Sequence, residues 1–261
     1  MEWTKKRIAF AAAVVALPII IVFVVMVVVL QGPSTGSSSP GGTNFAPPRS
    51  SLVPKATNSL PLAGFYDMPS ASFAGDNTFA WPGIPRDLQT FSNVRINIDG
   101  ATILGGGTGA QQNYHYREKV TGIPMNRKFE SLYLYHFTMW SDSPGAPVYD
   151  LVMNYEDGSS STNVIKYATD IFDFYAPPND ATEPSGTNSV VAWRGYFTVA
   201  SGANQALRTF LTELKNPKPS VLVISLDIYS RKNKSAGCVL GITTGPPGLI
   251  HNAKAVKTAV H

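Results

Sequence analysis

The chain has 261 residues and a formal net charge of +4, and only 15% of its residues are charged, whereas Gly and Pro occur 22 and 20 times. This balance is typical of short strands joined by turns, and it disfavours long helices with charged faces. Positions 60–245 carry 14 Lys and Arg against 16 Asp and Glu, a net charge of −2. We therefore expect no basic surface for binding nucleic acid.

The first predicted element is a membrane-spanning helix over residues 8–30, a run of 23 residues without a charge. A helix of this length covers roughly 35 Å, enough to cross a hydrocarbon core of about 30 Å. The run is longer than the apolar core of a cleaved secretory signal and lacks the small residues of a cleavage site. Basic residues 5–7 precede it, so the positive-inside rule predicts a cytoplasmic stub at 1–7 and an extracytoplasmic location for all that follows.

Residues 31–61 are predicted to form a disordered stalk, because Ser, Gly, Pro and Thr dominate them and little in them can be buried. A flexible segment of this length has a root-mean-square span of roughly 30 Å, so it tethers without fixing orientation. Residues 246–261 are expected to be a disordered tail. The folded domain is thus predicted at residues 62–245, without nucleic-acid contacts.

The predicted domain is all-β in pattern. Residues 91–98 alternate, with Val94, Ile96 and Ile98 on one face, and a turn is expected at Asp99-Gly100. Residues 129–140 are apolar on both faces, as in a central strand.

The second half of the domain continues the strand pattern. Residues 148–155 and 161–167 flank Glu156-Asp157-Gly158-Ser159, which predicts a hairpin. Further strands are expected at 193–199, 206–214, 221–229 and 239–244, and in the third of these Leu222, Ile224, Leu226 and Ile228 are expected to share one face. Short strands with regularly spaced turns indicate a two-sheet antiparallel sandwich of the jelly-roll type.

Several short motifs occur in a recognisable order: WPGIPR at 81–86, VRINIDG at 94–100, LYLYH at 132–136, YEDGS at 155–159, WRG at 193–195, NPKP at 216–219 and VISLDIYS at 223–230. In this order they resemble a family of bacterial extracytoplasmic β-sandwich modules, similar in architecture to galactose-binding-like domains. The resemblance covers about residues 75–245. It implies a fold, and it transfers no catalytic residue and no sugar-binding signature.

Aromatic residues in or beside predicted loops are the candidate ligand-binding residues, because sugar rings stack on exposed Trp and Tyr faces. They are Trp81, Tyr114, Tyr116, Trp140 and Tyr175. The alternative is that the tryptophans, Trp193 included, cap the ends of the hydrophobic core.

No catalytic residue is assigned from the sequence. Neither a G-x-S-x-G nor an H-E-x-x-H motif occurs. His136 lies in the middle of a predicted strand and is interpreted as structural, whereas His115 is expected to be exposed. The glycine-rich segment 105–109 lacks the Gly-Lys-Ser/Thr of a phosphate-binding loop and is interpreted as a mobile loop between strands. Cys238 is interpreted as a small buried hydrophobic residue.

No cofactor and no metal ligand are assigned, although jelly-roll sandwiches often hold a structural calcium ion. The carboxylates that could contribute to such a site are Asp142, Asp150, Glu156, Asp157, Asp170 and Asp173. They show no fixed ligand spacing.

The sequence favours a membrane-anchored extracytoplasmic binding module, located in the periplasm or at the cell surface, whose ligand is a glycan or an envelope protein. A structural component that assembles with itself or with an envelope complex is the first alternative. The second is a hydrolase with a dispersed carboxylate pair, since the two acids of a glycosidase can come from distant strands.

Overall fold

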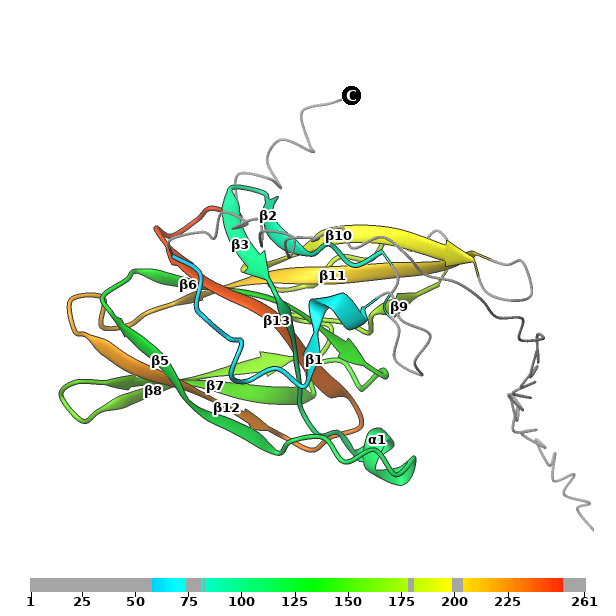
Figure 1. Cartoon of the computed structure of the whole chain (residues 1–261), viewed down its shortest axis with the longest axis horizontal. Coiled ribbons are helices and arrows are strands. Elements are labelled where there is room, and N and C mark those ends of the chain that lie inside the picture. Colours follow the sequence, from blue (N-terminus) through cyan, green and yellow to red (C-terminus); the bar gives the residue numbers. More distant parts are fainter. Residues whose placement is uncertain (1–57, 74–80, 82, 178–180, 199–203, 251–261) are drawn as a thin grey trace, which may run out of the picture. The chain divides into compact units, whose positions relative to one another are not determined.

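The computed structural model describes residues 58–73, 81, 83–177, 181–198 and 204–250. These residues are mostly β-structure, and their antiparallel strands form sheets arranged as a sandwich (Figure 1). The predicted stub, the predicted membrane span and most of the predicted stalk lie outside the described residues. Among the residues described, no helix combines the length and the apolar character that crossing a membrane requires.

The larger sheet has seven strands. Its order is β1-β4-β13-β6-β11-β10, and β9 pairs with β11 beside this path. The bounds are β1 (Met68–Pro69), β4 (Gly100–Ile103), β6 (Ser131–Met139), β9 (Tyr175–Ala176), β10 (Ser189–Thr198), β11 (Asn204–Lys215) and β13 (Ala236–Gly245).

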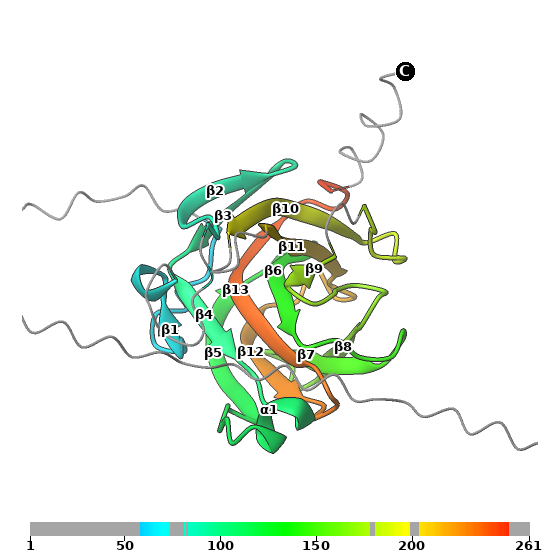
Figure 2. The ribbon, with the colours of Figure 1, turned by 90° about the vertical axis from the view of Figure 1, so that its right-hand side faces the viewer.

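The smaller sheet has four strands in the order β5-β12-β7-β8, and a separate hairpin pairs β2 with β3. Figure 2 shows the two sheets as the layers of the sandwich. The bounds are β2 (Asp87–Phe91), β3 (Val94–Ile98), β5 (Lys119–Arg127), β7 (Pro147–Tyr155), β8 (Ser160–Lys166) and β12 (Val223–Ser230); the short helices are η1 (Ser70–Ser72) and α1 (Gly107–Gln111).

The hydrophobic core lies between the sheets. Every residue of β6 is buried, which confirms the prediction of a central strand there. Burial of one large apolar side chain stabilises a fold by about 1.5–3 kcal/mol, so a fully buried strand contributes heavily to stability. The predicted β7–β8 hairpin is also confirmed: Gly158 has a φ of 78° in its turn, and Asp157 accepts a hydrogen bond from the backbone N of Ser159.

The prediction for residues 91–98 was wrong in its boundaries. Phe91 ends β2, and the chain turns at Ser92-Asn93, where Ser92 has a left-handed φ of 55°. The expected turn at Asp99-Gly100 is instead a bend that leads from the β2–β3 hairpin into the larger sheet. A Cβ atom on Gly100 would lie 2.5 Å from the ring of Tyr66, so this close approach requires glycine.

The expected alternation along residues 221–229 also fails at its start. The pairing of β12 is irregular between Val223 and Ser225, and this bulge shifts the inward face to Val223, Leu226 and Ile228. Ile224, expected in the core, is 43% exposed.

The packed region extends beyond residues 62–245 at both ends. Leu60 is buried and donates its backbone N–H to the carbonyl of Ile242, so this part of the expected stalk lies along β13. In the expected tail, Ile250 is buried and the backbone N of Gly248 donates to the carboxylate of Glu213. The mainly polar composition of these two segments predicted disorder, but the apolar residues at 60 and 250 pack into the core.

Candidate functional site

One end of the sandwich gathers three connections that are distant in sequence. They are the α1 segment between β4 and β5, the segment between β6 and β7, and the segment between β12 and β13. The backbone N atoms of Gly107 and Thr108 donate to the carbonyls of Asn233 and Lys234, at 2.5 and 3.2 Å. We call this the α1 end; α1 lies low in the view of Figure 1.

Three of the five predicted ligand-binding residues meet at the α1 end. Tyr114 and Tyr116 follow α1, and Trp140 directly follows β6. The ring centroids of Tyr114 and Trp140 are 6.1 Å apart, those of Tyr114 and Tyr116 are 5.8 Å apart, and those of Tyr116 and Trp140 are 6.5 Å apart. All three side chains are half-buried, so they form an aromatic cluster with part of its area facing solvent.

Glycines make this aromatic cluster sterically feasible. A Cβ atom on Gly109 would lie 3.0 Å from the indole of Trp140 and 3.3 Å from the ring of Tyr116. A Cβ atom on Gly106 would lie 2.5 Å from the backbone carbonyl oxygen of Ser235. The segment 105–109 was predicted to be a loop, whereas the structure forms α1 from Gly107 onward and packs it against the β12–β13 connection.

Trp140 has a left-handed backbone, with a φ of 63°. For a bulky side chain this conformation costs about 1–2 kcal/mol, and such outliers concentrate at functional sites. The hydroxyl of Thr138 donates to the carbonyl of Trp140, which holds the end of β6 in this turn. The strain places the indole over Gly109 instead of continuing the strand.

Asp173 links Ser141, just after β6, to Tyr175, the fourth of the predicted ligand-binding residues. Its carboxylate accepts hydrogen bonds from the hydroxyl of Ser141 and from the backbone N of Tyr175, both at 3.2 Å. Burial raises the pKa of Asp173 to about 6, and the hydrogen bonds only partly offset that effect. Tyr175 itself is 47% exposed. The side chain of Asp173 therefore titrates near neutral pH between Ser141 and an exposed tyrosine.

The fifth predicted residue, Trp81, belongs to the core. It is 2% exposed and packs against Phe73, Phe137 and Phe174, with ring centroids 4.9–6.4 Å away. Trp81 is therefore a core residue and not a ligand-binding residue, because no face of its ring is open to a ligand.

Ion pairs neutralise several charges around the α1 end. Arg117 pairs with Asp67, which also accepts the backbone N–H of Ile103 at 2.8 Å. Arg231 pairs with Asp150 at 2.8 Å. The charges of Arg117 and Arg231 are therefore compensated, which suits an uncharged ligand.

His136 is completely buried inside the sandwich. Its Nδ1 lies 2.5 Å from the hydroxyl of Tyr149, and its Nε2 lies 2.8 Å from that of Thr212. Complete burial lowers the pKa of His136 to about 3, so the ring is neutral at physiological pH. This histidine specifies the packing of β6, β7 and β11, as expected of a structural residue, and is out of reach of a substrate.

Protein donors engage each of the six carboxylates considered as calcium ligands. The donors are Ser235 for Asp142, Arg231 for Asp150, Leu222 for Glu156, Lys218 for Asp157, Lys166 for Asp170 and Ser141 for Asp173. Within the residues that the structure covers, no three His, Cys, Asp or Glu side chains are grouped so that they could hold a metal ion.

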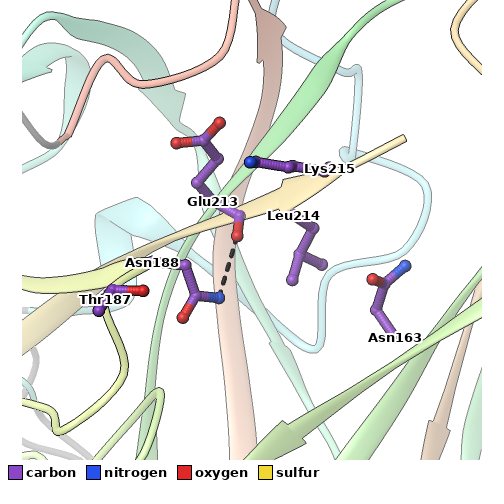
Figure 3. Close-up of a pocket in the computed structure, with 6 residues that line it drawn as sticks. All are labelled: Asn163, Thr187, Asn188, Glu213, Leu214 and Lys215. Atoms are coloured by element: carbon purple, nitrogen blue, oxygen red, sulfur yellow. Dashed lines mark hydrogen bonds between the residues drawn. The ribbon is translucent and has the colours of Figure 1, made fainter. Parts of the chain in front are cut away.

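A small hollow of about 240 Å³ lies away from the aromatic cluster, and Figure 3 shows its lining. Asn188 donates its side-chain amide to the backbone carbonyl of Glu213 at 3.1 Å. The Glu213 carboxylate points away from Asn188 in this view, and it accepts hydrogen bonds from Ser131 and Gly248. Asn188 and Glu213 thus bond to each other, whereas the buried side-chain amide nitrogen of Asn163, on β8, has no hydrogen-bond partner among the described residues.

Sequence reasoning missed the contributions of Ser141 and Gly109 to the site. Ser141 carried no motif, and its role depends on a contact with a residue 32 positions away. Gly109 stood in a conspicuous glycine-rich segment, but only the position of Trp140 shows what that glycine accommodates. No protein-family model, curated protein or solved structure matches this chain.

Proposed function

We propose that the protein is a membrane-tethered extracytoplasmic carbohydrate-binding module that binds hexose-containing glycans at its α1 end. The observation that carries this proposal is the convergence of Tyr114, Tyr116 and Trp140 from two distant parts of the chain. Partly exposed aromatic faces at the loop end of a β-sandwich match the C–H faces of pyranose rings.

Ser141, which follows Trp140 in the chain, and its hydrogen-bond partner Asp173 are proposed to add specificity. The carboxylate of Asp173 and the hydroxyl of Ser141 are acceptors that can bind sugar hydroxyls, and Tyr175 offers a further exposed ring. Because Arg117 and Arg231 are paired, the cluster favours neutral sugars. The proposed site does not include a calcium ion, because protein donors engage each carboxylate that was considered as a ligand.

The sheet topology supports the jelly-roll form of the sandwich. Four strands of the larger sheet, β4-β13-β6-β11, stand beside four of the smaller one, β5-β12-β7-β8, and the chain crosses between the sheets at most connections. This eight-stranded order is that of a jelly roll, an architecture that includes lectin domains. A galactose-binding-like module is consistent with it.

The tether rests on the apolar run at residues 8–30 and on the basic residues before it. These positions lie outside the described residues. Together with the Ser- and Pro-rich segment that follows, they hold the module near the outer surface of a membrane.

A second candidate function is self-assembly. Strand β10 ends the path of the larger sheet, and Tyr196 on it is 64% exposed. An edge strand with an exposed aromatic residue can pair with another chain. Concentration-dependent light scattering of the full chain in detergent tests it, because a strictly monomeric protein contradicts edge pairing.

The experiment for the main proposal is a glycan array probed with the full chain in detergent micelles. Saturable binding to one class of hexose glycans is expected, and Trp140→Ala should weaken it about 10-fold to 100-fold, as expected for the loss of a stacking ring. The matched control is Tyr196→Ala, which removes an exposed ring elsewhere. An array without binding, or equal losses in the two variants, would contradict the proposal. Repeating the array with EDTA tests whether glycan binding requires calcium.

A further inference from the structure

The end of the sandwich opposite α1 carries two adjacent hollows. Their volumes are about 540 and 330 Å³, and both are lined by Asn58 and by residues 244–246, at the end of β13. We call this the tether end, because Asn58 is the first described residue after the segment that contains the apolar run.

Three cationic side chains line these hollows. Arg127 and Lys128 belong to the larger hollow, Arg95 belongs to the smaller one, and Glu130 is the carboxylate among the lining residues. In the described part of the chain, none of the three cations forms an ion pair. Arg127 donates instead to the backbone carbonyls of Asn58 and Met125, at 3.1 and 3.2 Å. The lining thus has three cationic side chains against one carboxylate, Glu130, and none of the three cations pairs with a carboxylate among the described residues.

At the α1 end, Arg117, Arg231 and Lys232 each pair with a carboxylate, whereas the exposed Lys119 and Lys234 form no ion pair among the described residues. Most of the cations at the α1 end are therefore paired, but none of the three at the tether end is. Uncompensated cations gathered around an open hollow attract an anionic ligand, because their fields add and few protein acceptors compete for the donors. The chemistry that fits is a phosphate or a similar compact anion.

The position of the tether end indicates which anion it meets. Strand β13 has 10 residues, so the two ends lie about 30 Å apart along it, and Figure 1 shows α1 and the C-terminal end of β13 on opposite sides of the ribbon. Asn58 joins the domain to the predicted stalk at the tether end; its carbonyl accepts hydrogen bonds from Arg127 and from the backbone N of Thr244. In a membrane-anchored chain the stalk allows the domain to rotate, but the tether end is the end attached to it, so the stalk can bring these cations to the bilayer.

We infer that the tether end binds the phosphate groups of anionic lipid headgroups through Arg95, Arg127 and Lys128. This inference rests on the proposed membrane anchor at residues 8–30. Each basic residue near an anionic surface strengthens binding about fivefold. The stalk keeps the domain within roughly 30 Å of the bilayer, an effective concentration in the millimolar range, so a weak site suffices. Binding there points the α1 end away from the membrane, toward glycans.

The test uses the full chain in nanodiscs of phosphatidylcholine alone or with phosphatidylglycerol. A donor dye is attached through Ser220→Cys, an exposed loop position, and an acceptor dye is placed in the lipid headgroups; the buried Cys238 stays unlabelled. Energy transfer is expected to rise when phosphatidylglycerol is present. Arg95→Gln with Lys128→Gln should remove most of the rise, because two charges correspond to a roughly 30-fold change in affinity. Arg127 is left intact because it holds the backbone.

The matched control is Lys119→Gln with Lys234→Gln, which removes the same charge from exposed residues near the α1 end. This pair should keep the full rise. Equal transfer in both lipids, or an equal loss in both pairs, would overturn the tether-end site while leaving the anchor intact. Failure of the chain to enter discs of either composition would instead overturn the anchor, and with it this inference.

Discussion

The two ends of the sandwich share the strands that connect them but differ in packing and charge. At the α1 end, Gly106 lies so close to the backbone of Ser235 that it leaves no room for a Cβ atom, Gly109 lies against the rings of Trp140 and Tyr116, and Trp140 has a left-handed conformation. At the tether end, open hollows lie between residues whose cations have no carboxylate partner in the described part of the chain. Packing at the α1 end fixes the aromatic rings in place, whereas the cations at the tether end are available to an anionic ligand.

The two ends of the sandwich therefore suit two different kinds of ligand. A preorganised aromatic cluster suits specific recognition of a neutral ligand, since little side-chain entropy is lost on binding. Unpaired cations on an open surface suit a non-specific anionic surface, where orientation need not be exact. Four predictions test the difference, in order of decreasing effect.

The largest expected effect is Gly106→Ala at the α1 end. Gly106 has a φ of −137°, which alanine adopts freely, so the cost is purely steric. The new Cβ atom would meet the rigid backbone at Ser235, and we expect a loss of about 3 kcal/mol in the free energy of unfolding. Urea unfolding measures it. The matched control is Gly245→Ala at the tether end, where the nearest atoms are 3.4 Å away. A similar loss in both variants would contradict the difference in packing.

The next effect is a pH dependence centred on Asp173. Burial raises its pKa from 3.8 to about 6, so the folded state binds this proton more tightly than the unfolded state does. The contribution of Asp173 to stability is therefore most favourable below about pH 4 and falls as the pH rises through 6, by about 2 kcal/mol after allowance for partial exposure. Asp173→Asn should flatten this fall in thermal unfolding between pH 4 and 7. An unchanged slope in the variant would assign the fall to other groups.

A smaller effect is expected at the ion pair beside β4. Asp67→Asn weakens the contact with Arg117 and the hydrogen bond from the backbone N of Ile103, and should cost about 1 kcal/mol. Glu118→Gln, which breaks an exposed pair with Lys232, should cost at most about 0.5 kcal/mol. Denaturant unfolding of both variants measures the difference. Equal costs would show that Asp67 does not anchor this end.

The smallest effect on stability is expected at the tether end. Arg95→Gln with Lys128→Gln removes two charges that have no ion-pair partner among the described residues, so the free energy of unfolding should change by less than about 0.5 kcal/mol. The same unfolding assay measures it. A loss above about 1 kcal/mol would mean that these cations support the fold and are not available to a ligand.

Strand patterns predicted the sandwich where local signals agreed with tertiary packing. Residues 129–140 carry apolar side chains on both faces and contain the fully buried β6, and the turn after Tyr155 predicted the β7–β8 hairpin. Errors arose where local signals were weak. Ser92-Asn93 lacks the glycine typical of a two-residue turn, and the bulge near Ile224 depends on partner strands that periodicity does not reveal.

The candidate site was only partly predictable for the same reason. Aromatic composition selected Tyr114, Tyr116 and Trp140, but the contact between them depends on sheet topology. Composition also selected Trp81, because an aromatic residue beside a predicted loop looks the same whether it faces solvent or the core. The short helix α1 could not be predicted from a glycine-rich segment, since glycine disfavours helix and only contacts with the β12–β13 connection compensate.

Hydrogen–deuterium exchange of the full chain, with and without the oligosaccharide that the array selects, tests ligand binding at the α1 end most directly. Slower exchange is expected in residues 107–118 and 140–143, with no change at the tether end. Protection confined to residues 93–95, 127–130 and 244–246 would contradict the assignment and place the glycan site in the hollows beside the stalk.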